Sequence, residues 1–96
     1  MKAAFLSPAA VELAEAIHFY ESQQVELGRQ FLDAIDRAIE EIKQNPERWP
    51  IREKQTRRYL VGRFPYAILY RIDFEQITIV AIMHLHRRAN YWTKRI

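Results

Sequence analysis

The sequence contains no cysteine, and this absence excludes disulfide bonds and cysteine-ligated zinc sites. It also contains no apolar run near the roughly 20 residues that span a bilayer. The start of the chain is too short for a signal-peptide core, because Pro8 and the charged run from Glu12 follow at once. We therefore expect a cytoplasmic protein that makes no use of a membrane.

Motifs of several enzyme classes are missing as well. The chain has no phosphate-binding loop, nucleophile elbow or zinc-finger spacing, and no repeat or low-complexity segment. Its 96 residues, 49% hydrophobic and 28% charged, suit a single globular domain over residues 1–96. We expect no cofactor and no metal, because His84 and His86 have no third ligand at short spacing.

Charge is divided unevenly between the two halves of the chain. Residues 1–50 carry five Lys or Arg against nine Asp or Glu, a net charge of −4. Residues 51–96 carry ten against three, a net charge of +7. A basic surface of this kind is typical of a protein that binds nucleic acid or an acidic polypeptide, and the plainer alternative is a solvated face.

Two amphipathic segments predict a helical hairpin after a short strand at residues 2–6. Over residues 8–22, apolar side chains recur at spacings of three and four, and Pro8 suits the first turn of a helix. The same periodicity runs over residues 26–45 and stops before Pro46. Such a hairpin needs a partner layer to cover its apolar side.

Three strand patterns follow, at residues 57–61, 66–72 and 76–84. The order of elements predicts an α+β fold: an N-terminal strand, a two-helix hairpin and a three-stranded antiparallel meander, with the helices on one face of the sheet. The last strand is expected to alternate strictly, with one face formed by Ile77, Ile79, Ala81 and Met83. Both faces of this strand are apolar, so a second segment is expected to cover part of the other face.

Histidines, arginines and a tyrosine gather near the ends of the predicted strands. Arg63 stands at a strand junction, and His84 and His86 share a face if the last strand continues past them. Arg87 and Tyr91 follow. Cleaving RNA without a metal needs a base, an acid and cations for the developing charge, and these residues supply such groups. Without an aligned acid and base, the same residues would only bind an anionic surface.

Two further pairs have plainer interpretations. Arg57 and Arg58 alternate faces of a strand, so one of them can be purely solvated. Tyr91 and Trp92 form either an aromatic latch that packs on the sheet, which we favour, or a surface on which bases stack.

Three segments carry a resemblance to a known superfamily. They are Arg57-Arg58-Tyr59-Leu60, the run Arg63-Phe64-Pro65-Tyr66-Ala67-Ile68-Leu69-Tyr70, and His84-x-x-Arg87-x-x-x-Tyr91-Trp92. Together with the order of elements, they make the chain similar to the RelE/ParE superfamily of toxins from type II toxin–antitoxin systems, over nearly its whole length. The ending most resembles the ParE-like branch, in which a proline often occupies the position of Ala89.

The resemblance implies a bacterial toxin that is held inactive in an oligomeric complex with a cognate antitoxin. ParE members are known as inhibitors of DNA gyrase, whereas RelE members cut mRNA in the ribosomal A site. We favour the gyrase inhibitor, a non-catalytic function, because only Lys54 stands where ribosome-dependent nucleases usually carry several lysines. The RelE-like alternative, with the ribosome and mRNA as partners, would use Arg63, Arg87 and Tyr91 at the family's positions, with His84 or His86 as acid.

A third alternative is a binding protein without toxic activity, whose basic face only meets an acidic antitoxin or operator DNA. For the antitoxin, we expect a basic-rimmed apolar groove that takes an amphipathic helix or an extended segment, with carboxylates near Arg57, Arg58 or Arg63. The residues predicted to bind the target or the antitoxin are Arg57, Arg58, Arg63, Arg87, Tyr91 and Trp92.

Overall fold

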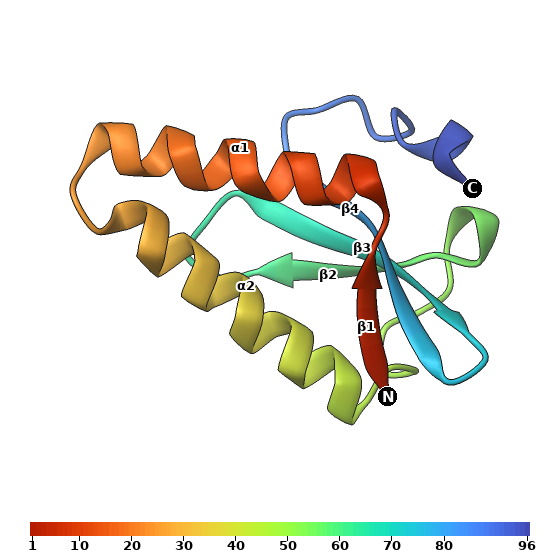
Figure 1. Cartoon of the computed structure of the whole chain (residues 1–96). Coiled ribbons are helices and arrows are strands. Elements are labelled where there is room, and N and C mark those ends of the chain that lie inside the picture. The colour runs from red at the N-terminus through yellow and green to blue at the C-terminus, as the bar shows by residue number, and fades with distance from the viewer.

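The computed structural model describes residues 1–96 as one sheet with two helices on one of its faces (Figure 1). The elements are β1 (Lys2–Phe5), α1 (Ser7–Gln23), α2 (Leu27–Gln44), β2 (Arg57–Val61), β3 (Tyr66–Asp73) and β4 (Gln76–His84), with short 3-10 turns at Glu53–Gln55 and Thr93–Arg95. The strand order is β1-β4-β3-β2, in which β1 runs parallel to β4 and the other pairs are antiparallel. The predicted α+β architecture is therefore confirmed, with each helix boundary within one residue of its expected place. Neither helix is long and apolar enough to cross a bilayer.

The apolar stripe of α2 forms the centre of the main core. Its buried side chains recur every three or four residues, and they are Phe31, Ile35, Ala38, Ile39 and Ile42. Helix α1 buries less, because only Ala9 and Ala16 are fully covered along it. Four rings then join the helices to the β2–β3 turn, with centroid separations of 4.9–6.2 Å among Tyr20, Phe31, Phe64 and Tyr66. The helical layer is thereby fixed to the end of the sheet where β3 begins and β4 ends.

The opposite face of the sheet is covered by the C-terminal segment. Trp92 is only 4% exposed and packs with Leu69, Val80 and Met83, while its indole N–H donates to the carbonyl of Ala89 at 2.8 Å. This is the packing role that we favoured for the Tyr91–Trp92 pair. The second face of the sheet, apolar in sequence, thus has its cover within the same chain.

A bulge in β4 changes which side chains face the helices. Leu69 pairs with Ala81 and Tyr70 pairs with Ile79, so Val80 is an extra residue in the ladder. Val80 and Ala81 therefore both join the core under the C-terminal segment, and Ile82 returns to the helical core. The strict alternation predicted for β4 is wrong beyond Ile79, because the bulge shifts the side-chain pattern by one residue.

Close contact between the two helices depends on Gly28. A Cβ atom at this position would lie 2.6 Å from the carbonyl oxygen of Ile17 and 3.0 Å from Cβ of Glu21. The Glu21 carboxylate also accepts the backbone N–H of Gly28 at 3.0 Å and that of Glu26 at 3.0 Å, and so satisfies donors at the start of α2. The hairpin therefore has no room for a side chain at this crossing.

We expect Gly28→Ala to lower the free energy of unfolding by about 1–2 kcal/mol. Overpacking costs about 1–3 kcal/mol, and the better helix propensity of alanine offsets part of that cost. Gly62→Ala is the matched control, because a Cβ there meets nothing within 4 Å and Gly62 has no positive φ. Urea denaturation of both variants gives the comparison, and equal stability of the two would contradict the packing argument.

Candidate functional site

Beyond the end of β1, the edge of β4 that β1 leaves unpaired is covered by side chains. Strand β1 pairs with residues 76–79 only, so the polar backbone groups that follow lack a strand partner on that side. Glu12 of α1 accepts the N–H of Ile82 at 3.1 Å, and Arg95 donates to the carbonyl of Val80 at 3.0 Å. Two side chains from opposite ends of the sequence thus take the place of a neighbouring strand.

Glu12, Tyr91 and Arg95 form a nearly buried cluster. Two guanidinium nitrogens of Arg95 lie 2.8 Å from the two carboxylate oxygens of Glu12, and the Tyr91 hydroxyl donates to the same carboxylate at 2.5 Å. The side chains of Glu12 and Arg95 are only 12% and 17% exposed. This paired arrangement anchors the C-terminal segment to α1.

The cluster shifts the pKa of each of its acidic groups. Burial acts to raise the pKa of Glu12, but hydrogen bonds from Arg95, Tyr91 and the backbone outweigh it and hold that pKa below its ordinary value. Burial, reinforced by the neighbouring Glu12 carboxylate, raises the pKa of Tyr91. A tyrosine in this state is a poor proton donor at neutral pH, so the geometry suits Tyr91 to anchoring the segment.

His84 and Arg87 border a small cleft beside this cluster. The cleft has a volume of about 150 Å³ and is lined by Glu12, Glu15, Ala16, Phe19, Tyr66, Ile82, His84 and Arg87. The Arg87 guanidinium lies over the Tyr91 ring, 3.9 Å from its centroid, and His84 packs against the rings of Tyr66 and His86 at 5.1 and 5.0 Å. The predicted residues His84, His86, Arg87 and Tyr91 therefore come together.

The histidine pair is held in a defined hydrogen-bonding state. Nδ1 of His84 accepts the backbone N–H of His86 at 3.1 Å. Nδ1 therefore carries no proton in this arrangement, and a neutral His84 bears its proton on Nε2. Only Nε2 of His84 is left to meet a ligand, and it meets that ligand as a donor.

The other predicted arginines lie apart from this cleft. Arg63 has a left-handed backbone (φ 78°), donates to Gln30 of α2 and stacks on Phe64 at 5.2 Å. Arg57 donates to the carbonyls of Glu47 at 3.0 Å and Trp49 at 2.6 Å, which fastens the crossover segment to β2. Neither arginine contacts His84 or Arg87, so the structure does not assemble the full set of residues proposed for RNA cleavage.

A second hollow, which we call the β2 groove, runs beside β2 and α2. It has a volume of about 400 Å³ and is lined by Glu41, Arg48, Trp49, Pro50, Arg52, Arg58, Tyr59 and Leu60. The Trp49 and Tyr59 rings pack at 4.9 Å, and Leu60 is 57% exposed. Burial and a 2.5 Å hydrogen bond to Glu41 raise the pKa of Tyr59 to about 12, so its hydroxyl stays neutral.

Three arginines and the carboxylate of Glu41 line the β2 groove beside its apolar and aromatic side chains, and Arg58 is the one of these arginines that was predicted as a binding residue. Arg48 and Arg52 were missed, because they belong to the irregular crossover, where periodicity carries no information about facing. Strand β2 is also an edge strand, whose outer side carries only an isolated bridge between Arg57 and Ile51. The edge therefore still offers unpaired backbone groups to another chain.

Comparisons with known proteins agree with this fold and element order. The family model described as the ParE toxin of the type II toxin–antitoxin system parDE matches residues 4–89. A solved structure described as the chromosomal ParDE toxin–antitoxin system from P. aeruginosa is 20% identical, with a TM-score of 0.66, and the match covers 90% of this chain and 97% of that one. At this identity the structural likeness shows a shared fold. No curated protein matches the chain.

Proposed function

We propose that this protein, which belongs to the ParE toxin family of type II toxin–antitoxin systems, arrests growth by binding DNA gyrase in the cytoplasm. The observation that carries the proposal is the family match over residues 4–89, which spans the end of β1, both helices and strands β2, β3 and β4. The C-terminal motif resembles that of the ParE branch, and this resemblance favours gyrase as the target. The action proposed is binding without catalysis by the toxin itself.

The state of the polar residues supports a non-catalytic function. Cleavage of RNA would need a proton donor aligned with cations around one phosphate. Tyr91 is instead bound to Glu12, and Arg63 is bound to Gln30 outside the cleft. The cleft also carries the exposed carboxylate of Glu15, which repels a phosphate.

A RelE-like nuclease remains the second candidate, because His84 and Arg87 line one cleft. His84 is the histidine among the residues that line this cleft, and histidine is the side chain most often used as a general acid or base. If cleavage occurs, His84→Ala should lower its rate by about 10²–10⁴-fold. For gyrase inhibition, by contrast, His84→Ala should matter little.

We further propose that a cognate antitoxin neutralises the protein by occupying the β2 groove. Arg48, Arg52 and Arg58 suit an acidic segment, and Trp49 and Leu60 suit aliphatic side chains on it. An extended part of the segment can also pair with the free edge of β2. The antitoxin in this proposal has apolar anchors flanked by carboxylates.

Two assays with the purified protein separate the two targets. The wild type should inhibit DNA supercoiling by gyrase and leave translated mRNA uncut, as followed by primer extension. Arg87→Ala should weaken the inhibition, whereas Arg88→Ala, a change at the next exposed arginine, should not. Ribosome-dependent cleavage that His84→Ala abolishes, with folding intact by circular dichroism, would overturn the gyrase proposal.

A further inference from the structure

The β3–β4 turn exposes an aromatic ring in a strained backbone conformation. Asp73 pairs with Gln76, so Phe74 and Glu75 are the two turn residues. Phe74 has φ 55°, in the left-handed region that two-residue hairpin turns normally fill with Gly, Asn or Asp. A bulky side chain in this region is a genuine outlier, and such outliers cluster at sites of function.

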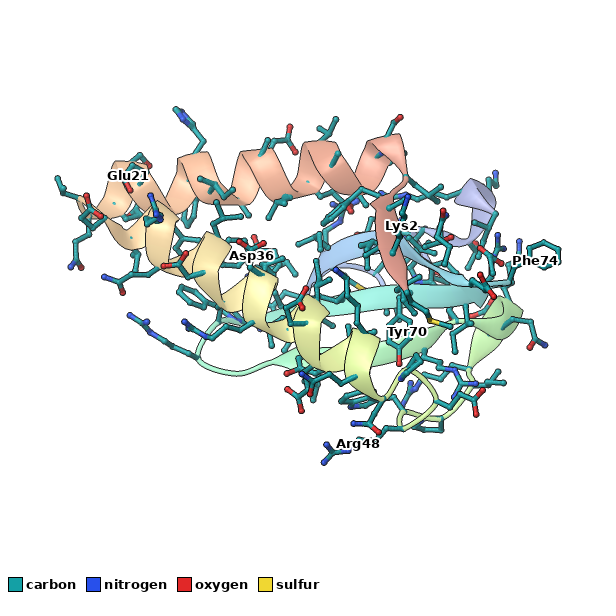
Figure 2. All side chains as sticks on the ribbon, turned by 60° about the horizontal axis from the view of Figure 1, so that its bottom comes forward. Lys2, Glu21, Asp36, Arg48, Tyr70 and Phe74 are labelled. Atoms are coloured by element: carbon teal, nitrogen blue, oxygen red, sulfur yellow. The ribbon has the colours of Figure 1, made fainter.

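Phe74 contributes nothing to either core of the protein. It is 100% exposed, and its ring extends away from the ribbon in Figure 2. Phe31 and Phe64, by contrast, are buried at 0% and 7% exposure. The neighbouring Glu75 is also exposed and forms no ion pair. The turn therefore presents an apolar ring and a free carboxylate side by side to the solvent.

The base of the turn is rigidly braced. The Asp73 carboxylate accepts from Nε of Arg71 at 2.9 and 3.1 Å and from the Thr78 hydroxyl at 2.7 Å, and so links β3 to β4. Gln76 donates to the same hydroxyl at 3.3 Å. A ring held on a braced turn loses little conformational entropy when it is buried by a partner, which is typical of an aromatic anchor in an interface.

The β2 groove carries the groups that would complement this turn. Its only carboxylate, that of Glu41, is paired with Arg48 at 3.6 Å, whereas Arg52 and Arg58 form no ion pair. Beside these two unpaired cations, the groove exposes the apolar side chain of Leu60. A cavity of about 150 Å³ already binds benzene, so a groove of about 400 Å³ has room for a phenyl ring. The groove therefore suits an aromatic side chain with a carboxylate next to it.

We propose that, in the toxin without its antitoxin, the Phe74–Glu75 turn of one copy docks into the β2 groove of a second copy. The Phe74 ring lies among the apolar side chains of that groove, and the Glu75 carboxylate meets the guanidinium groups of Arg52 and Arg58. Both surfaces belong to the same chain, and each supplies the group that the other leaves without a partner. A contact between two unlike surfaces repeats from copy to copy unless its rotation closes a ring.

Charge favours a second copy over other occupants of the turn. An antitoxin segment acidic enough for the arginines of the β2 groove would be repelled by Glu75, and so would the phosphates of DNA. The β2 groove, by contrast, is basic and partly apolar on every copy of the chain. The antitoxin proposed for the same groove would compete with the second copy, so the contact belongs to the free toxin. It does not depend on gyrase as the target.

The test is sedimentation equilibrium of the purified toxin alone, from about 10 μM to about 1 mM, because an interface this small is weak. The mean mass of the wild type should rise with concentration. Phe74→Ala should weaken this self-association by about 30-fold or more, the effect of losing an interface hot spot. Val25→Ala, at a 76% exposed residue of another turn, should associate as the wild type does. Glu75→Lys should weaken association severalfold, whereas Glu26→Lys, at a second exposed turn position, should not.

A mixing experiment tests the turn and the groove as two halves of one contact. Leu60→Glu damages the groove and leaves the turn intact, whereas Phe74→Ala damages the turn and leaves the groove intact. At a concentration where half of the wild type is associated, each variant alone should be monomeric. Their equimolar mixture should form a dimer with one copy of each, since one variant supplies the turn and the other supplies the groove. Val11→Glu, at a 54% exposed residue of α1, is the matched control for the added carboxylate and should associate as the wild type does.

Several outcomes would overturn the inference. A wild type that is monomeric at every concentration would do so, and so would a mixture of Phe74→Ala and Leu60→Glu that stays monomeric. Self-association that both variants retain would show that a different interface joins the copies. If the wild type is monomeric and Phe74→Ala loses gyrase inhibition or antitoxin binding, the turn belongs to that partner instead. Inhibition of supercoiling by the wild type is measured separately, so failure of this inference is distinct from failure of the proposed function.

Discussion

Glu12→Ala is expected to lower the free energy of unfolding by about 3 kcal/mol, a loss typical of breaking a nearly buried ion pair. The substitution leaves the Arg95 guanidinium without its carboxylate at 17% exposure, and it leaves the N–H of Ile82 without an acceptor. It also releases the Tyr91 hydroxyl, so the C-terminal segment that carries Trp92 is held less firmly. Urea denaturation, followed by circular dichroism and tryptophan fluorescence, measures the change.

Two variants control for other effects of the substitution. Glu15→Ala changes an exposed residue one turn further along α1, and it should alter stability by no more than about 0.5 kcal/mol. Combining Glu12→Leu with Arg95→Met removes both charges, and this pair should recover part of the loss. Equal stability of Glu12→Ala and Glu15→Ala would contradict the assignment of Glu12 as the anchor of the C-terminal segment.

Leu60→Glu is expected to weaken antitoxin binding by about 100-fold, because it places a carboxylate among the apolar side chains of the β2 groove. Such a loss corresponds to about 2.7 kcal/mol, within the range of a central interface residue. Val11→Glu is the matched control, since Val11 on α1 is 54% exposed and Leu60 is 57% exposed. Calorimetric titration of the cognate antitoxin into each variant gives the affinities.

Salt dependence tests the balance of contacts in the same complex. Apolar contacts in the groove are little screened, so wild-type neutralisation should weaken only modestly up to about 0.5 M salt, where the Debye length is a few ångströms. Arg58→Ala should reduce affinity less than Leu60→Glu, and it should flatten the salt dependence further. Complete loss of the wild-type complex at high salt would show that rim charges, not the apolar floor, hold the antitoxin.

The helices and strands were predictable because their patterns are local. Phe31, Ile35 and Ile42 recur with the helical period along one stripe, and the turn residues separate the strands without ambiguity. The bulge at Val80 was not predictable, because Val80 and Ala81 are both apolar and suit either face. Register in such a strand is decided by its neighbours in the sheet rather than by its own sequence.

The site was predictable in its residue types and less so in its arrangement. His84 and Arg87 share a cleft as their spacing suggested, but Arg57 is bound to two carbonyl groups of the crossover. The sequence places Arg57 and Arg58 on opposite faces of a strand without showing which of them meets a partner, and the fold gives only Arg58 to the β2 groove. Glu12 was missed altogether, because its partners Tyr91 and Arg95 lie 79 and 83 positions away and no local pattern links them.

The Glu12–Arg95 contact also determines when during synthesis the fold can close. Lys2 of β1 pairs with Gln76 of β4, and the carboxylate of Glu12 must wait for a guanidinium 83 positions later. Contacts this distant in sequence form slowly, and the contact of Glu12 is not available until Arg95 has been synthesised. A chain that stops before Arg95 therefore lacks the guanidinium that pairs with Glu12 and donates to the carbonyl of Val80. The open edge of β4 is therefore completed only after Arg95 has been synthesised.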